Sequence, residues 1–231
     1  MVRMPISCKI FYVNSPNDLN IIYDRLNNRI LKSRTQLIDG VSYELTVKFF
    51  EVTLSQGRLV CKLRFQDLIN SYDIDMKLKP IINTYEANLD FRVKSKTFVL
   101  INPSKHAEKT VKYLRYALET ETTRPEIYKY IIPKHRIDEI MVKNPGTIKT
   151  GHYKGIDLPG WDSLTIYGDD LTRSQEMVNF IREHSTDGEG YIIWTLSENG
   201  WTIGITRYGE VVCWKNLEFR QLADFVTEKF L

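Results

Sequence analysis

Residues 43–65 read YELTVKFFEVTLSQGRLVCKLRF, and this stretch decides the fold. Apolar and polar side chains alternate on both sides of a short polar segment, Ser55-Gln56-Gly57. Alternation with a period of two is typical of a half-buried strand, and a glycine-containing turn between two such runs predicts a β-hairpin. The predicted buried face carries Tyr43, Leu45, Val47 and Phe49 from the first strand and Leu59, Cys61, Leu63 and Phe65 from the second.

The segments around this hairpin continue the pattern. Residues 6–13 and 86–101 are rich in β-branched and aromatic side chains and are predicted to form strands. A helix is predicted over 103–119, where Ala107, Val111 and Leu114 recur at helical spacing. The first part of the chain is therefore expected to run strand, helix, meander, helix.

The second half is divided from the first by a proline-rich stretch. Residues 121–160 contain four prolines, which predict short helices at 126–132 and 134–143 and irregular chain over 144–160. Residues 190–214 predict a three-stranded meander. A final helix is predicted from its apolar seam of Phe219, Leu222, Val226 and Phe230.

Strands that follow one another, bracketed by helices, indicate an α+β fold rather than a parallel α/β fold. We expect antiparallel meander sheets, each followed by a packing helix, in two segments. The expected domains are 1–120, an α+β domain with a basic sheet face, and 161–231, a second α+β domain. Residues 121–160 are the expected connector.

Composition places few limits on function. The 231 residues carry a net charge of +3, which neither demands nor excludes nucleic acid. Three cysteines without close spacing predict neither a disulfide framework nor a zinc site, and they favour a reducing compartment. Residues 1–13 lack the features of a signal peptide, and no apolar run reaches the ~20 residues of a membrane helix. A cytoplasmic location is expected, although a nuclear or virus-encoded protein would share these features.

Positive charge is concentrated on the solvated side of the predicted sheet and on the helix that follows it. Side chains alternate across a strand, so the polar positions leave the core face together. Between residues 92 and 115 the chain has seven Lys or Arg side chains and a single Glu, a local charge of +6. The candidate nucleic-acid-binding residues are Lys48, Lys62, Arg64, Arg92, Lys94, Lys105, Lys109 and Lys112.

Such a surface suits phosphate, because neutralising phosphates releases their counterions. Tyr113 and Tyr116 lie on the same predicted helix and could pack on sugars or bases. The alternative is a plain solvated face, since antiparallel sheets commonly have one and lysines protect edge strands. Glu44, Glu51 and Asp90 could pair with some of the cations. The sequence leaves both interpretations open.

A catalytic alternative comes from residues 72–77, which read YDIDMK. On a strand, Asp73, Asp75 and Lys77 would share one face. Asp-x-Asp resembles a metal-binding arrangement of nucleotidyl transferases and primases, and Asp-x-Lys resembles the core of restriction-type nucleases. The resemblance implies a carboxylate that holds Mg²⁺ and a lysine that steadies the attacking water. A polar strand face without catalysis is the other interpretation.

A second acidic motif, Tyr167-Gly168-Asp169-Asp170, resembles the signature of RNA-dependent polymerases, in which paired aspartates hold two metals. A helix rather than a returning strand is predicted after it, and acidic residues near a helix N-terminus are favourable without any metal. The four histidines have no metal-ligand spacing. No metal or cofactor is therefore expected.

These patterns together favour a nucleic-acid-binding protein without catalysis of its own. Its basic sheet face and the 103–119 helix would contact DNA or RNA mainly through phosphates. The C-terminal meander and helix could serve self-association or a protein partner, with the seam near Phe225 and Phe230 as the candidate surface. The alternatives are a metal-dependent nuclease or nucleotidyl transferase and a protein-interaction component of a larger complex.

Overall fold

The computed structural model describes residues 5–38, 40–72, 74, 76, 78–94, 97–103, 105–133, 139, 143, 146–197, 200–215 and 217–231. It is broadly α+β, as the sequence predicted, and most of its regular structure is antiparallel sheet. The strands are β1 (Ile6–Ser15), β2 (Ile30–Ile38), β3 (Val41–Ser55), β4 (Arg58–Tyr72), β5 (Leu78–Lys94), β6 (Thr97–Pro103), β7 (Glu126–Lys129), β8 (Gly146–Leu158), β9 (Trp161–Tyr167), β10 (Ser185–Leu196), β11 (Thr202–Thr206) and β12 (Glu210–Cys213). The helices are α1 (Leu19–Leu26), α2 (Ala107–Leu118), α4 (Gln175–His184) and α5 (Phe219–Phe230), with a 3-10 turn η1 (Leu171–Arg173).

The chain divides into two compact units. The hairpin unit comprises Tyr12–Tyr128, and the terminal unit comprises Met1–Phe11 together with Lys129–Leu231. The chain passes from one unit to the other within β1 and again at the end of β7. The expected domains, 1–120 and 161–231 with a connector over 121–160, stay a prediction.

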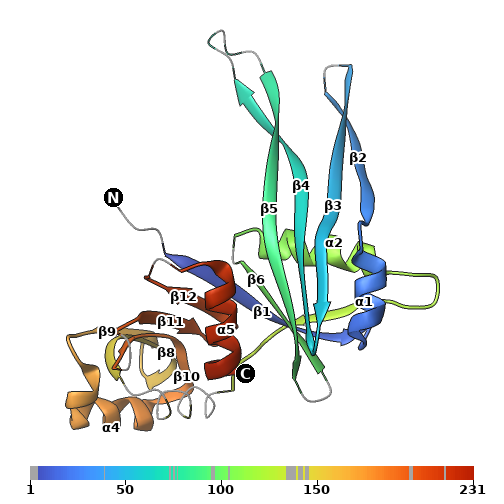
Figure 1. Ribbon diagram of the computed structural model, residues 1–231. Coiled ribbons are helices and arrows are strands. Elements are labelled where there is room, and N and C mark those ends of the chain that lie inside the picture. The colour runs from blue at the N-terminus through green and yellow to red at the C-terminus, as the bar shows by residue number, and fades with distance from the viewer. Residues whose placement is uncertain are drawn as a thin grey trace. The chain divides into compact units, whose positions relative to one another are not determined.

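The hairpin unit contains an antiparallel sheet in the order β2-β3-β4-β5-β6. The predicted hairpin is confirmed: Ser55 pairs with Arg58 around a two-residue turn, and Gly57 has the positive φ of 67° that such turns require. On one face of β3, β4 and β5, the side chains of Val47, Phe49, Leu63, Phe65 and Leu89 are fully buried, and α1 and α2 cover that face (Figure 1). The rings of Tyr113 on α2 and Phe65 on β4 lie 5.4 Å apart, so α2 packs directly on that face.

This sheet forks. The β3–β4 ladder ends at the pair Val47 and Phe65, whereas β2–β3 and β4–β5 stay paired out to their own turns. At the fork, the side-chain Oε1 of Gln66 accepts a hydrogen bond of 2.9 Å from the backbone N–H of Thr46. The side-chain amide takes the place of the next ladder bond. Beyond it, β2–β3 and β4–β5 diverge as two separate hairpins (Figure 1).

The terminal unit contains a second antiparallel set of strands in the order β1-β12-β11-β10-β8-β9, with residues 6–9 of β1 paired to β12. The predicted meander is confirmed as β10, β11 and β12. Its core is aromatic: Trp194 is buried and meets Phe230 of α5 edge-on, with ring centroids 6.2 Å apart. Phe225 is also buried, so the apolar seam of the last helix is part of the core.

The expected connector over 121–160 is wrong in two places. Residues 126–129 form β7 instead of a helix, and residues 146–158 form β8 instead of irregular chain. Gly146 in this stretch is a position of close approach in the sheet, since a Cβ on it would lie 2.2 Å from the carbonyl oxygen of Thr195. Three register shifts accommodate β8 against β10. Most of the helix expected at 134–143 lies outside the described residues.

All three cysteines are free and buried, as predicted for Cys61 and Cys213, and Cys8 joins them. Burial raises the pKa of the Cys8 and Cys61 thiols far above the usual range for cysteine. In the part of the chain that the structure describes, no helix has the length and apolar character needed to span a bilayer.

Candidate functional site

Three of the predicted nucleic-acid-binding residues lie together on the face of the hairpin-unit sheet opposite the helices. Lys48 of β3 pairs directly with Arg64 of β4, and Lys62 lies two positions along the same strand. Their neighbours in sequence, such as Val47 and Phe65, are fully buried on the helix-covered face. Alternation therefore places these cations on one common surface, as expected.

Acidic side chains neutralise much of this surface. Lys62 Nζ lies 2.5 Å from a carboxylate oxygen of Glu51, and a guanidinium nitrogen of Arg64 lies 2.5 Å from Glu86. Glu51 reaches Lys62 from a bulge in β3, where its own φ is 50°. Among the described residues, Lys48 is the one cation of these three without an ion pair. The sheet face thus alternates in sign and presents less positive charge than its sequence suggests.

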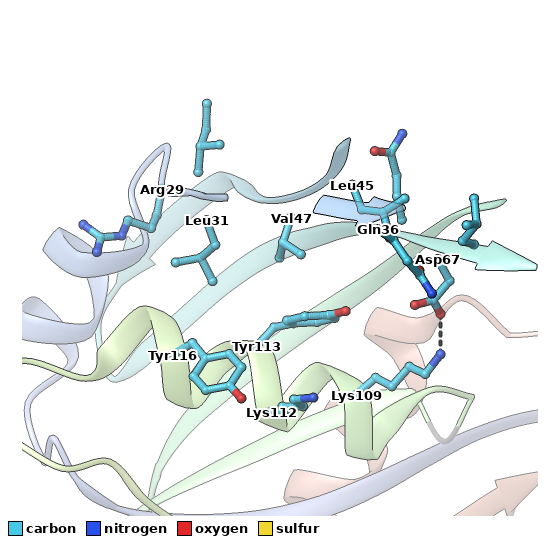
Figure 2. Close-up of a pocket in the computed structure, with 13 residues that line it drawn as sticks. Arg29, Leu31, Gln36, Leu45, Val47, Asp67, Lys109, Lys112, Tyr113 and Tyr116 are labelled. Carbon is cyan, nitrogen blue, oxygen red and sulfur yellow. Dashed lines mark hydrogen bonds and ion pairs between the residues drawn. The ribbon is translucent and has the colours of Figure 1, made fainter. Parts of the chain in front are cut away.

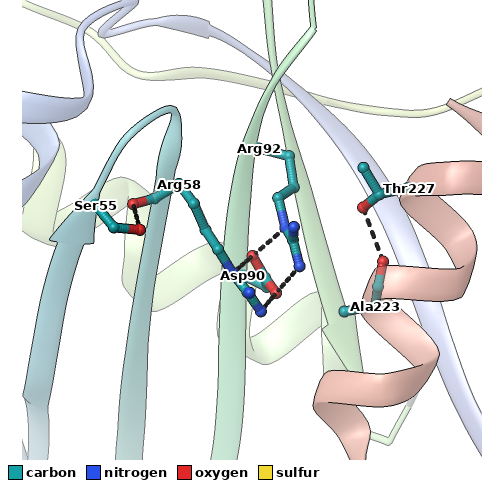
Figure 3. A network of polar contacts seen from close by, with 6 residues as sticks. All are labelled: Ser55, Arg58, Asp90, Arg92, Ala223 and Thr227. Atoms are coloured by element: carbon teal, nitrogen blue, oxygen red, sulfur yellow. Dashed lines mark hydrogen bonds and ion pairs between the residues drawn. The ribbon is translucent and has the colours of Figure 1, made fainter.

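Arg92 has a structural role. It lies directly across from Arg58, and like charges in that arrangement repel. Asp90, of which 1% is exposed, lies between the two guanidinium groups and accepts two hydrogen bonds from each, at 2.6–3.2 Å (Figure 3). A buried carboxylate that is bonded in this way fixes β4 against β5.

Three of the remaining predicted residues lie on α2 or just before it. Lys109 and Lys112 are exposed on α2, and Lys105 is exposed in the turn before it. Lys94 ends β5, and its side chain lies outside the described residues. Since α2 packs on the buried face of the sheet, Lys109 and Lys112 lie on the opposite side of the sheet from Lys48, Lys62 and Arg64.

On the α2 side is a pocket of about 700 Å³, which is the best candidate for a functional site (Figure 2). It lies between α2 and the strands β2, β3 and β4, at the base of the fork. The apolar side chains that line it are Ile30, Leu31, Leu45, Val47 and Leu68. The polar ones are Arg29, Gln36, Gln66, Asp67, Lys109 and Lys112, and two tyrosines, Tyr113 and Tyr116, complete the wall.

The pocket has a positive rim. Figure 2 shows Lys109 joined to Asp67 by an ion pair at one end of the pocket. The hydrogen bond that Lys109 donates to the Asp67 carboxylate raises the pKa of Lys109, so this lysine stays charged. The ammonium of Lys112 lies 5.9 Å from the ring centre of Tyr116. Among the described residues, neither Arg29 nor Lys112 forms an ion pair, so both charges remain for a ligand.

His106 precedes α2 and packs against aromatic rings of β4 and β5. Its backbone is left-handed, with φ of 65°, and its ring packs 4.4 Å from that of Tyr85 and 5.7 Å from that of Phe65. The Nε2 atom is buried and has no hydrogen-bond partner among the described residues. Burial, followed by the charges of Lys105 and Lys109, lowers the pKa of His106.

The catalytic motif at 72–77 stays a prediction, and the described residues show other partners for the second acidic motif. Asp73, Asp75 and Lys77 lie outside the described residues, while Ile74 and Met76 between them belong to the turn from β4 to β5. Asp170 pairs with Arg173 at 3.2 Å, and the carbonyl oxygen of Asp169 accepts a hydrogen bond from Lys149. Within the described ranges, no three His, Cys, Asp or Glu side chains come close enough together to hold a metal.

The chain matches no protein-family model, and no curated protein is significantly similar to it. The case for function therefore depends on the pocket itself. Sequence reasoning found Lys109, Lys112, Tyr113 and Tyr116 because they recur along one helix. It missed Arg29, Gln36, Gln66 and Asp67, which reach the pocket from β2, from β4 and from the chain before β2.

Proposed function

We propose that this protein binds nucleic acid without catalysis of its own, through the α2 side of the hairpin unit. The observation that carries the proposal is the pairing of two available cations, Arg29 and Lys112, with two tyrosines around one pocket. Cations supply the phosphate contacts that dominate affinity for nucleic acids, and aromatic rings supply stacking for bases.

The sheet face supports such binding less well. Lys62, Arg64 and Arg92 already have carboxylate partners there, and a phosphate would have to compete with Glu51, Glu86 or Asp90. On the α2 side, Lys105 and Lys112 extend the positive rim along one stretch of chain. Phosphate contacts from this side would be weakly sequence-specific and sharply dependent on salt.

The test is fluorescence anisotropy with labelled single- and double-stranded DNA and RNA over a salt series. We expect an Arg29→Glu/Lys112→Glu variant to bind at least about tenfold more weakly, with a salt slope reduced by about 1 for each lost phosphate contact. The matched control is Lys48→Glu/Lys62→Glu, which changes the net charge equally on the opposite face. Absence of binding by the wild type at low salt, or loss of binding in the control alone, would contradict the proposal.

The same samples test catalysis. With Mg²⁺ or Mn²⁺ added, we expect the labelled strands to remain intact on a denaturing gel. Cleavage or extension that disappears in Asp75→Ala would favour the metal-dependent nuclease or nucleotidyl transferase instead.

A second candidate is a protein-interaction component, and the turn of the β4–β5 hairpin favours it. Ile74 is 99% exposed and Met76 is 78% exposed, a large apolar surface at the end of a hairpin. If this turn mediates self-association, sedimentation of the wild type will depend on concentration and that of Ile74→Ser/Met76→Ser will not. Independence from concentration in both proteins would remove self-association through this turn.

A further inference from the structure

We infer that the pocket beside α2 receives a single unstacked base, so that the ligand class is single-stranded nucleic acid. This inference rests on the proposed function and specifies which form of nucleic acid the site accepts. It depends on the shape of the pocket, on the position of its charges and on the hydrogen bond that the side-chain amide of Gln66 already accepts.

The shape excludes a paired base. The site is concave and about 700 Å³ in volume, and the part of its sheet side that faces the tyrosines of α2 is formed by the apolar residues Leu31, Leu45 and Val47 (Figure 2). Pockets of about 300–1,000 Å³ with apolar walls and a few polar groups are the usual form of small-ligand sites. Inside a duplex, both faces of a base are stacked and its edge is paired, so only an unpaired or extruded base can enter such a hollow.

The charges suit the backbone on either side of an inserted base. Lys109, Lys112, Tyr113 and Tyr116 form the α2 side of the pocket and face Leu31, Leu45 and Val47 on the sheet side (Figure 2). Arg29 and Lys112 are exposed at the rim, so they can neutralise phosphates while a base lies deeper between the tyrosines and the aliphatic wall. Tyr116 is 53% exposed and already lies beside the Lys112 ammonium, which makes it the best placed of the two rings to stack.

Gln66 provides polar recognition. Its Oε1 is occupied by the N–H of Thr46, so its NH₂ group is the part of the amide left to donate hydrogen bonds. Such a donor suits a base carbonyl oxygen. Asp67, the acidic group of the pocket, is held by Lys109.

The experiment compares three ligands of equal length: a thymidine oligomer, the same strand built from abasic units, and a DNA duplex. The first two carry the same phosphates and differ in their bases. We expect the wild type to bind the thymidine oligomer about tenfold or more tightly than the abasic strand, the gain that stacking on one ring supplies. The duplex should bind no more tightly than the abasic strand.

Two variants make the test specific. Tyr116→Ala should lose most of the preference for thymidine over abasic strand and keep the affinity for the abasic strand. The matched control is Tyr128→Ala, whose ring is 54% exposed and lies outside the pocket, and it should keep the preference. Leu31→Trp, which fills the pocket from β2, should act like Tyr116→Ala.

The outcomes separate the two proposals. Salt-dependent binding of equal strength to all three ligands, unchanged in Tyr116→Ala, would overturn the base pocket and leave phosphate-led binding standing. Absence of binding to every ligand at low salt would overturn both. Preference for thymidine that disappears only in the pocket variants would support both.

Discussion

Lys109 on α2 forms an ion pair with Asp67 on β4, and this pair joins the helix to the sheet across one end of the pocket. The two residues are 42 positions apart in the chain. In this pair the carboxylate neutralises the positive charge of Lys109, which would otherwise be available to a ligand. The pair therefore sets both the charge of the pocket and the position of α2.

Removing the acid should strengthen nucleic-acid binding. Asp67→Asn frees the charge of Lys109, so affinity should rise by up to about tenfold and the salt slope should steepen by about 1. The Lys109 side chain is half exposed, so the free energy of unfolding should change by less than about 1 kcal/mol. Anisotropy titrations and urea denaturation measure the two effects. Glu86→Gln, which frees Arg64 on the opposite face, is the control and should leave affinity unchanged.

Asp90 should be among the most important polar residues for stability. Asp90→Asn leaves two largely buried guanidinium groups facing each other, so the free energy of unfolding should fall by about 3 kcal/mol or more. Chemical denaturation followed by circular dichroism measures this. Glu86→Gln, an exposed ion-pair partner, should cost less than about 1 kcal/mol. Equal costs for the two substitutions would mean that Asp90 does not hold β4 and β5 together.

His106 should make the protein sensitive to mild acid. Its pKa is lowered in the fold, so below about pH 6.5 the unfolded chain binds the proton more readily and stability falls as the pH falls. His106→Asn keeps a residue type that tolerates the left-handed backbone and removes the titration. The free energy of unfolding of the wild type should fall relative to that of the variant between about pH 7.5 and about pH 5.5. A constant difference would contradict the lowered pKa.

The cysteines should be unreactive in the folded state. Cys8 and Cys61 are fully buried with raised pKa values, and burial also raises the pKa of Cys213. Because thiolate is the reactive form, a thiol reagent should label all three only as fast as the protein opens. Stopped-flow labelling with and without denaturant measures this. Rapid labelling of one thiol in native buffer would show that its part of the sheet opens locally.

The sequence predicted what depends on neighbouring residues. The β3–β4 hairpin follows from strict alternation around Gly57, and α2 follows from the spacing of Val111 and Leu114. An apolar helix seam packs on the apolar face of a sheet, so the lysines of α2 lie on the opposite side of the sheet from the polar positions of β3 and β4. The single basic surface expected from the sequence is therefore two surfaces.

The missed features depend on distant partners. Asp90 joins Arg58 from 32 residues away, and no local spacing indicates such a pair. β8 was missed because its glycines resemble those of a loop, and only the close approach of β10 distinguishes the two. The pocket is missed for the same reason, since its wall comes from β2, β3, β4 and α2.

The fork at Thr46 and Gln66 divides the amide protons of the sheet into two classes. Backbone N–H groups point alternately to one side of a strand and to the other. Beyond the fork, the N–H groups of Ser42 and Glu44 on β3 and of Leu68 and Asn70 on β4 therefore point into the space between the two hairpins, where no described strand accepts a hydrogen bond from them. Pro80 lies opposite Asn70, where the β4–β5 ladder needs no donor, so its missing N–H costs no bond. Past the fork, deuterium should therefore replace hydrogen quickly at every second amide and slowly at those between. The amide hydrogens of each hairpin then exchange independently of the other hairpin. Between the pair Val47 and Phe65 and the β3–β4 turn, where β3 and β4 are paired, the amide hydrogens of the sheet exchange together.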